Sequence, residues 1–264
     1  MNAIDIIKKA IYYPLNNVQN WILVALIFLV KGVFEQLALT TEGAISGIMT
    51  VISILISIVI LGLVINIIRE TISGSNELSL VNPQLNVIDG IKSFILQVIY
   101  FIIPGILTFI VSLIVGVYDK LIRVLDVAVT QTNTTINSTA ILSSIPSNLT
   151  NELFISIAVV VIIGFILYII FAMFSDIGQA ILAETGSIFA GLNITKVVSK
   201  INSIGWEKYI TYVVLLFLLM IVFALISGII TSLPYIGRVI ASFIFESYML
   251  IVTAHATGLI YMEG

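Results

Sequence analysis

The C-terminal stretch of the chain, residues 232–264, carries charged side chains inside an apolar run that is long enough to cross a membrane. Leu233-Pro234 ends the preceding segment, because proline lacks an amide donor and disfavours helix in the residue before it. From Tyr235 to Tyr261 most residues are apolar, and at about 1.5 Å per residue such a helix crosses a hydrocarbon core of about 30 Å. Arg238, Glu246 and His255 interrupt the run. Because lipid penalises such groups, this helix must hide them against other helices.

Composition indicates that those other helices also lie in the membrane. Hydrophobic residues make up 60% of the chain and charged residues only 9%, whereas soluble domains carry about 25% charged residues. The sequence therefore predicts an all-α fold: a polytopic integral membrane protein built as a six-helix transmembrane bundle, with short amphipathic helices at the interface. The predicted spans, in a single transmembrane domain, are residues 21–39, 45–68, 91–117, 153–174, 209–231 and 235–261.

Shorter features lie between and within these spans. The isoleucines of residues 1–20 recur at helical spacing between polar residues, which predicts an amphipathic helix in the membrane interface. Asn193 is a predicted cap for a second such helix, over residues 194–201. Pro104-Gly105 lies inside the third span and predicts a kink or a pair of half-helices.

The distribution of lysine and arginine predicts the orientation in the cell membrane. Six spans place both termini on one side, which would carry seven of these residues against three on the other, so we expect cytoplasmic termini. The polar loop 131–151 is then extracellular, with glycosylation sequences at Asn133, Asn137 and Asn148. The seven are Lys8, Lys9, Arg69, Lys92, Lys196, Lys200 and Lys208, and the three are Lys120, Arg123 and Arg238.

Four charged residues lie at matched depths in the first and sixth predicted spans. Lys31 and Glu246 each lie about 15 Å inward from the outer surface, and Glu35 and Arg238 lie nearer to it. One interpretation is a proton or ion relay. Another is a set of buried ion pairs that fix which helix packs on which, and a third is that the two spans do not touch. Lys31 also has a possible partner in its own helix, since residues four apart, such as Glu35, are neighbours there.

His255 completes the set of candidate intramembrane polar residues. A single histidine beside Ala254, Ala256 and Gly258 is typical of a hydrogen bond between closely packed helices, so we expect no catalytic role for it. Asp176 and Glu184, near the inner end of the fourth span, are expected to be solvated at the interface. With no cysteine and one histidine, the sequence predicts no catalytic, cofactor-binding or metal-binding residue.

Four segments, taken in order, resemble one family. They are Ile4-x-x-x-x-Lys9-Ala10-x-x-Tyr13-Pro14 followed by Asn20-Trp21, then Asp89-Gly90-x-Lys92, Glu184-Thr185-Gly186-Ser187-x-Phe189, and Ala254-His255-x-x-Gly258-x-x-Tyr261. Together they are similar to the domain of unknown function 4013 group, a set of largely archaeal, polytopic membrane proteins. The last residues depart from the family's pattern, which more often ends in glycine, a polar residue, alanine, tyrosine and arginine. The resemblance implies a polytopic topology and no particular activity.

Three function classes follow from these features. The first, which the sequence favours, is a non-enzymatic component of the cell envelope that binds or organises partners. The second is a small transporter or channel that uses Lys31, Glu35, Arg238 and Glu246, and it requires a polar cavity that reaches them. The third, an intramembrane enzyme, lacks HExxH, GxSxG or paired-aspartate motifs. Expected partners are the lipid bilayer and a membrane protein or second copy, with no cofactor. The net charge of −3 argues against nucleic acid.

Overall fold

The computed structural model of the chain describes residues 1–75, 77–78, 83–132, 146–234 and 236–264. Helices dominate this part of the chain, and no strand occurs within it. Six helices are long and apolar enough to cross a membrane, which confirms the predicted all-α polytopic fold. They are α2 (Val18–Thr40), α3 (Gly43–Ile72), α4 (Pro83–Ile114), α7 (Ser147–Thr185), α10 (Trp206–Thr231) and the segment Gly237–Tyr261.

The chain forms two compact units. The first contains Met1–Gln97 and Met173–Gly264, and the second contains Val98–Ala172. Helices α4 and α7 each contribute residues to both units.

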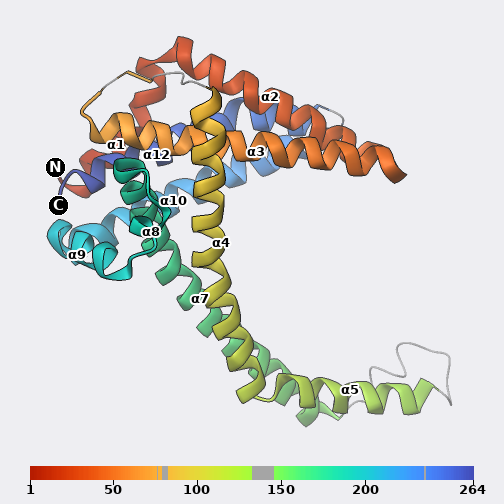
Figure 1. The fold of residues 1–264 in the computed structure, drawn as a ribbon. Helices are drawn as coiled ribbons and strands as arrows, with labels where there is room; N and C mark the ends of the chain where they lie inside the picture. The colour runs from red at the N-terminus through yellow and green to blue at the C-terminus, as the bar shows by residue number, and fades with distance from the viewer. Residues whose placement is uncertain (76, 79–82, 133–145, 235) are drawn as a thin grey trace. The chain divides into compact units, whose positions relative to one another are not determined.

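The first unit is assembled around the C-terminal helix. This span consists of α11 (Gly237–Ile240), the π-helical segment η1 (Ala241–Glu246) and α12 (Ser247–Tyr261). Half of the residues in its 18-residue apolar stretch are buried, whereas none of the residues in the apolar stretch of α10 are. Helix α12 packs against α3 and α1 (Ala3–Asn16), and η1 packs against α2 (Figure 1). This burial by neighbouring helices lets the span retain polar and charged side chains.

Short amphipathic helices accompany the spans, as predicted. The N-terminal helix α1 is capped by the side chain of Asn2, which accepts a hydrogen bond from the Asp5 amide at 2.8 Å. Helix α9 (Ile194–Ile204) is capped by Asn193, whose Oδ1 accepts from the Lys196 amide at 3.1 Å. Between α7 and α9 lies the short helix α8 (Ile188–Gly191).

Helices α3 and α4 touch backbone to backbone. A Cβ atom on Gly62 would lie 1.8 Å from the Asn86 carbonyl oxygen, and one on Gly90 would lie 1.9 Å from the Ile58 carbonyl oxygen. Such separations are far below any allowed contact, so only glycine fits at either position. Small residues at close crossings are typical of helix packing in membranes.

The second unit is a helical hairpin with an amphipathic extension, α5 (Val117–Thr132). Gly164 of α7 faces Thr108 of α4, where a Cβ would meet the threonine methyl at 2.9 Å. The Phe101 and Tyr168 rings stack with centroids 6.2 Å apart. Helix α4 continues through Pro104, so the alternative of two half-helices is not what the chain forms.

The ends of the predicted polar loop, residues 131–151, belong to helices. Helix α5 extends to Thr132 and α7 begins at Ser147, which places an exposed Asn148 in the first turn of α7. Asn133 and Asn137 lie outside the described residues.

Candidate functional site

Two helical segments present the predicted intramembrane charges to each other. Helix α2 carries Lys31 and Glu35 one turn apart. Arg238, Ser242 and Glu246 recur at intervals of four along α11 and η1. Single π-helical turns such as η1 are frequently found at functional sites.

Gly32 allows these segments to approach closely. A Cβ atom there would lie 2.9 Å from the Ser242 Cβ and 3.2 Å from the Val239 Cα. The absence of a side chain therefore brings the neighbouring Lys31 within reach of η1.

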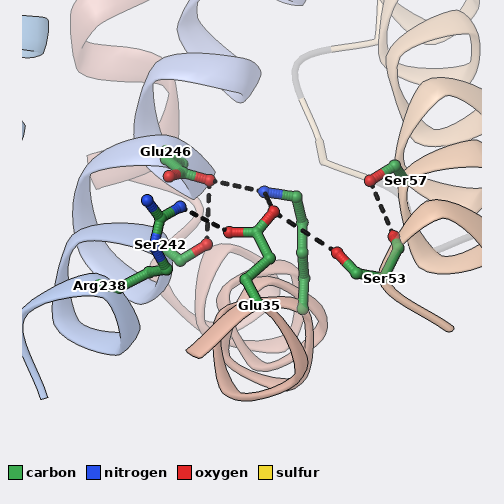
Figure 2. Close-up of polar contacts among 7 residues, drawn as sticks. Glu35, Ser53, Ser57, Arg238, Ser242 and Glu246 are labelled. Carbon is green, nitrogen blue, oxygen red and sulfur yellow. Dashed lines mark hydrogen bonds and ion pairs between the residues drawn. The ribbon is translucent and has the colours of Figure 1, made fainter. Parts of the chain in front are cut away.

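The four charged side chains are joined by consecutive ion pairs and are here called the charge cluster (Lys31, Glu35, Arg238 and Glu246). The Lys31 Nζ lies 2.8 Å from Glu35 Oε1 and 3.1 Å from Glu246 Oε2. Arg238 Nη1 lies 3.1 Å from Glu35 Oε2, and the Ser242 hydroxyl donates to Glu246 Oε2 at 2.9 Å (Figure 2). The predicted contact between the two spans is confirmed, and Lys31 also makes the rival contact within its own helix.

Charge balance explains how the cluster is tolerated. A lone charge near the bilayer centre costs about 2.5–3.5 kcal/mol on insertion scales. The cluster contains two cations and two carboxylates, so its formal charge is zero. Lys31 is the most enclosed, with 16% of its side chain exposed, and Arg238 is the least, with 38% exposed. The described contacts therefore support the ion-pair interpretation and exclude the one in which the spans do not touch.

A groove of about 510 Å³ with polar and apolar walls reaches one end of the charge cluster. Its walls include Glu35 and Arg238, together with a row of hydroxyls on one face of α3. We call it the hydroxyl groove. The row consists of Ser46, Thr50, Ser53 and Ser57.

A second groove of about 390 Å³, between α10 and the last span, reaches the other end. It is mostly apolar, and we call it the apolar groove; its walls include Met220, Phe223, Phe245 and Met249. Glu246 contributes to the same wall, with 34% of its side chain exposed. The two carboxylates that share Lys31 thus lie in different grooves.

The structure does not bring His255 into the charge cluster. Its Nδ1 lies 2.8 Å from the hydroxyl of Thr71, and that hydroxyl donates to the Ile67 carbonyl. Because a hydroxyl has one hydrogen, Nδ1 must carry a proton and donate to Thr71. The imidazole stacks on Tyr13 with ring centroids 3.7 Å apart, so His255 joins α12 to α3 and α1. Burial raises the pKa of Tyr13 to about 12, with a smaller effect from the negative charge of Glu70.

Two of the family-like segments contact each other, which residue-by-residue reasoning missed. Asp89 pairs with Arg69 Nη2 at 2.8 Å, and Arg69 Nε donates to the Ala183 carbonyl at 2.9 Å. Lys92 Nζ donates to the Gly186 carbonyl at 2.9 Å. The sequence feature that could have predicted these contacts is the Asp89-Gly90-x-Lys92 segment, together with the basic residue Arg69 at the end of the preceding span.

The carboxylate of Asp176 is enclosed by the protein, contrary to the expectation that it would be solvated. Its Oδ1 accepts a hydrogen bond from Thr257 at 2.5 Å, and its Oδ2 is enclosed. Glu184 accepts a hydrogen bond from the Tyr261 hydroxyl at 2.5 Å, which joins α7 to the end of α12. In the described ranges, no three histidine, aspartate or glutamate side chains gather as a metal site would require.

Sequence comparison finds one family. The model of a family described as protein of unknown function (DUF4013) matches residues 45–232, well over half of the chain. The Asp89 and Glu184 segments fall within the match, and the N-terminal and C-terminal segments lie outside it. No curated protein and no solved structure matches the chain.

Proposed function

The chain belongs to the DUF4013 family, whose function is unknown, and we propose that it is a non-enzymatic, membrane-embedded binding or organising component of the cell envelope. The observation that supports this proposal is the hydroxyl groove. It presents a row of hydroxyl oxygens, which can accept hydrogen bonds, and the ion-paired Glu35 and Arg238 to a polar group of a partner in the same membrane. Sites of this kind fix orientation with a few placed polar groups.

The charge cluster supports a fixed arrangement over a relay. The ammonium of Lys31 lies between the two carboxylates, of which Glu35 lines the hydroxyl groove and Glu246 lines the apolar groove. A relay requires these groups to exchange partners. Because breaking one partner out of a buried pair costs about 3–5 kcal/mol, a set of mutually paired charges resists that exchange.

One observation favours a small transporter or channel as the second candidate. Glu35 opens on the hydroxyl groove and Glu246 on the apolar groove, and a single lysine joins them. Intramembrane acids and bases arranged in series are typical of proton pathways.

A flux measurement separates the two candidates. We expect liposomes that contain the purified protein to acidify no faster than protein-free liposomes under a valinomycin-induced potential, measured with a trapped pH-sensitive dye. The physical reason is that Lys31 is held by both carboxylates. Protein-dependent acidification that Glu35→Gln abolishes would refute the binding assignment and favour the transporter.

We further propose that the protein lies in the cell membrane with both termini in the cytoplasm. The excess of lysine and arginine on that side supports the orientation. The salt bridge between the amino group of Met1 and Glu263 at 2.6 Å, which holds the ends of the chain together, supports only their placement on the same side (Figure 1).

Single cysteines test this orientation without background, since the chain contains none. Glu77 and Asn148 are both exposed and lie on opposite predicted sides. In intact cells, a membrane-impermeant maleimide is expected to label Asn148→Cys and to label Glu77→Cys only after permeabilisation. The opposite labelling pattern would invert the topology.

A further inference from the structure

Helices α7, α10 and α12 enclose a carboxylate that has no cation beside it. Asp176 Oδ1 accepts a hydrogen bond from Thr257 Oγ1 at 2.5 Å. Its Oδ2 is buried and has no hydrogen-bond partner. Among the residues that the structure describes, none of the ion pairs includes Asp176.

Hydroxyl oxygens surround this carboxylate. The hydroxyl of Tyr212 lies 3.2 Å from Thr257 Oγ1, and it is the donor when Asp176 is ionised, because the single hydrogen of Thr257 then goes to Asp176. The hydroxyl of Tyr209 donates to the Met173 carbonyl at 2.6 Å. Both phenols face Asp176, and both are fully buried. Their hydrogens are already committed, whereas each oxygen retains lone pairs that can act as ligands.

Neither protonation state of Asp176 is satisfied by the protein alone. An ionised carboxylate in this position is a buried charge without a counter-charge, which is costly. A carboxyl protonated on Oδ1 can donate to Thr257 Oγ1, but Oδ2 is then a buried carbonyl oxygen to which no group donates. A small cation against Oδ2 removes both penalties. One carboxylate balances one positive charge, so a monovalent ion with oxygen ligands fits the site and a divalent ion would leave excess charge.

We propose that Asp176, Thr257, Tyr209 and Tyr212 form a sodium-binding site that ties α7, α10 and α12 together. Sodium is a hard cation that takes oxygen ligands, and backbone carbonyl oxygens coordinate it inside transporter folds. The site is separate from the charge cluster and from both grooves, and it serves the stability of the first unit whether the protein binds a partner or transports an ion.

The test is thermal unfolding of the full-length protein in detergent, followed by the fluorescence of its two tryptophans. Sodium chloride, potassium chloride and choline chloride are compared at equal ionic strength. We expect saturating sodium to raise the Tm by about 5–10 °C over choline, because a ligand that binds only the folded state stabilises it. Asp176→Asn is expected to remove this sodium-dependent rise.

Two threonines one turn apart on α12 provide a matched pair. Thr257→Val removes the hydroxyl that touches Asp176 and is expected to shift the sodium response to concentrations at least tenfold higher. Thr253→Val removes a hydroxyl that donates to the Leu250 carbonyl and is expected to leave the response unchanged. If Asp176→Asn does not fold, the difference in sodium response between Thr257→Val and Thr253→Val tests the proposal instead.

Three results would overturn the proposal. The first is an equal rise in Tm in sodium and choline, which would leave a protonated Asp176 as the explanation. The second is a sodium response that survives in Asp176→Asn or is equal in the two threonine variants. The third is a rise in potassium alone, which would exclude sodium as the ion.

Discussion

Replacing Gly62 with alanine is expected to lower the Tm of the purified protein by about 6–12 °C, measured by thermal unfolding in detergent. The added Cβ would lie 1.8 Å from the carbonyl oxygen of Asn86 and 2.5 Å from its carbonyl carbon. Both are backbone atoms of α4, so no side-chain rotation relieves the overlap. The helices must separate instead, which breaks the contact that joins α3 to α4.

Gly47 is the matched control on the same helix. A Cβ there has no neighbour within 4 Å, so Gly47→Ala is expected to stabilise the protein by about 0.5–1 kcal/mol through the higher helix propensity of alanine. Gly90→Ala is expected to reproduce the loss, since its Cβ would lie 1.9 Å from the Ile58 carbonyl oxygen. Equal Tm values for the Gly62 and Gly47 variants would show that α3 and α4 do not cross this closely.

Replacing Lys31 with methionine is expected to destabilise the protein by about 3 kcal/mol, which is the low end of the cost of breaking a buried ion pair. The change keeps the length and apolar stem of the side chain and removes the charge that Glu35 and Glu246 share. Glu35 retains Arg238, so most of the cost falls on Glu246. The low end applies because Glu246 keeps the Ser242 hydroxyl and 34% of its side chain is exposed.

Chemical or thermal unfolding in detergent measures this loss. Lys8→Met is the control, because Lys8 is exposed on α1, and it is expected to change stability by less than about 0.5 kcal/mol. A similar small effect of Lys31→Met would mean that the ammonium contributes nothing to the packing of α2 on η1.

The fold was predictable because membrane burial leaves a strong signal. Each span is an apolar run of the length that a bilayer demands, and the polar segments between them mark the connections. The boundaries were less predictable where amphipathic helices continue past the apolar run. Helix α7 begins at Ser147 and extends to Thr185, beyond the predicted span 153–174 at both ends, and past residue 174 it buries Ser175 and the Oδ2 of Asp176.

The charge cluster was predictable in part, from depth alone. Lys31 and Glu246 lie equally far from the outer ends of their spans, and so they meet. Depth does not reveal how a helix is rotated, however, and it gave no indication that Lys31 bonds both carboxylates. The same limitation left His255 grouped with the cluster, although it faces α1 and α3.

Contacts between segments distant in sequence were the hardest to predict. The pairing of Arg69 with Asp89 and the enclosure of Asp176 by two tyrosines depend on helix crossings. Each of those residues lies near the end of an apolar run, where a polar side chain usually faces water. Only the packed arrangement distinguishes a buried polar contact from a solvated one.

The most direct test of a paired, neutral charge cluster is the coupling energy between Lys31→Met and Glu246→Gln. We expect each single change to destabilise the protein and the double variant to recover at least half of the summed loss. The double variant removes one cation and one anion and leaves the Glu35–Arg238 pair intact.

Lys31→Met combined with Glu35→Gln is the comparison, because it leaves both Arg238 and Glu246 without their ion-pair partners. It is expected to recover less than the first double variant. Strictly additive losses for Lys31→Met and Glu246→Gln, or a larger recovery with Glu35→Gln, would contradict an ion pair between α2 and η1.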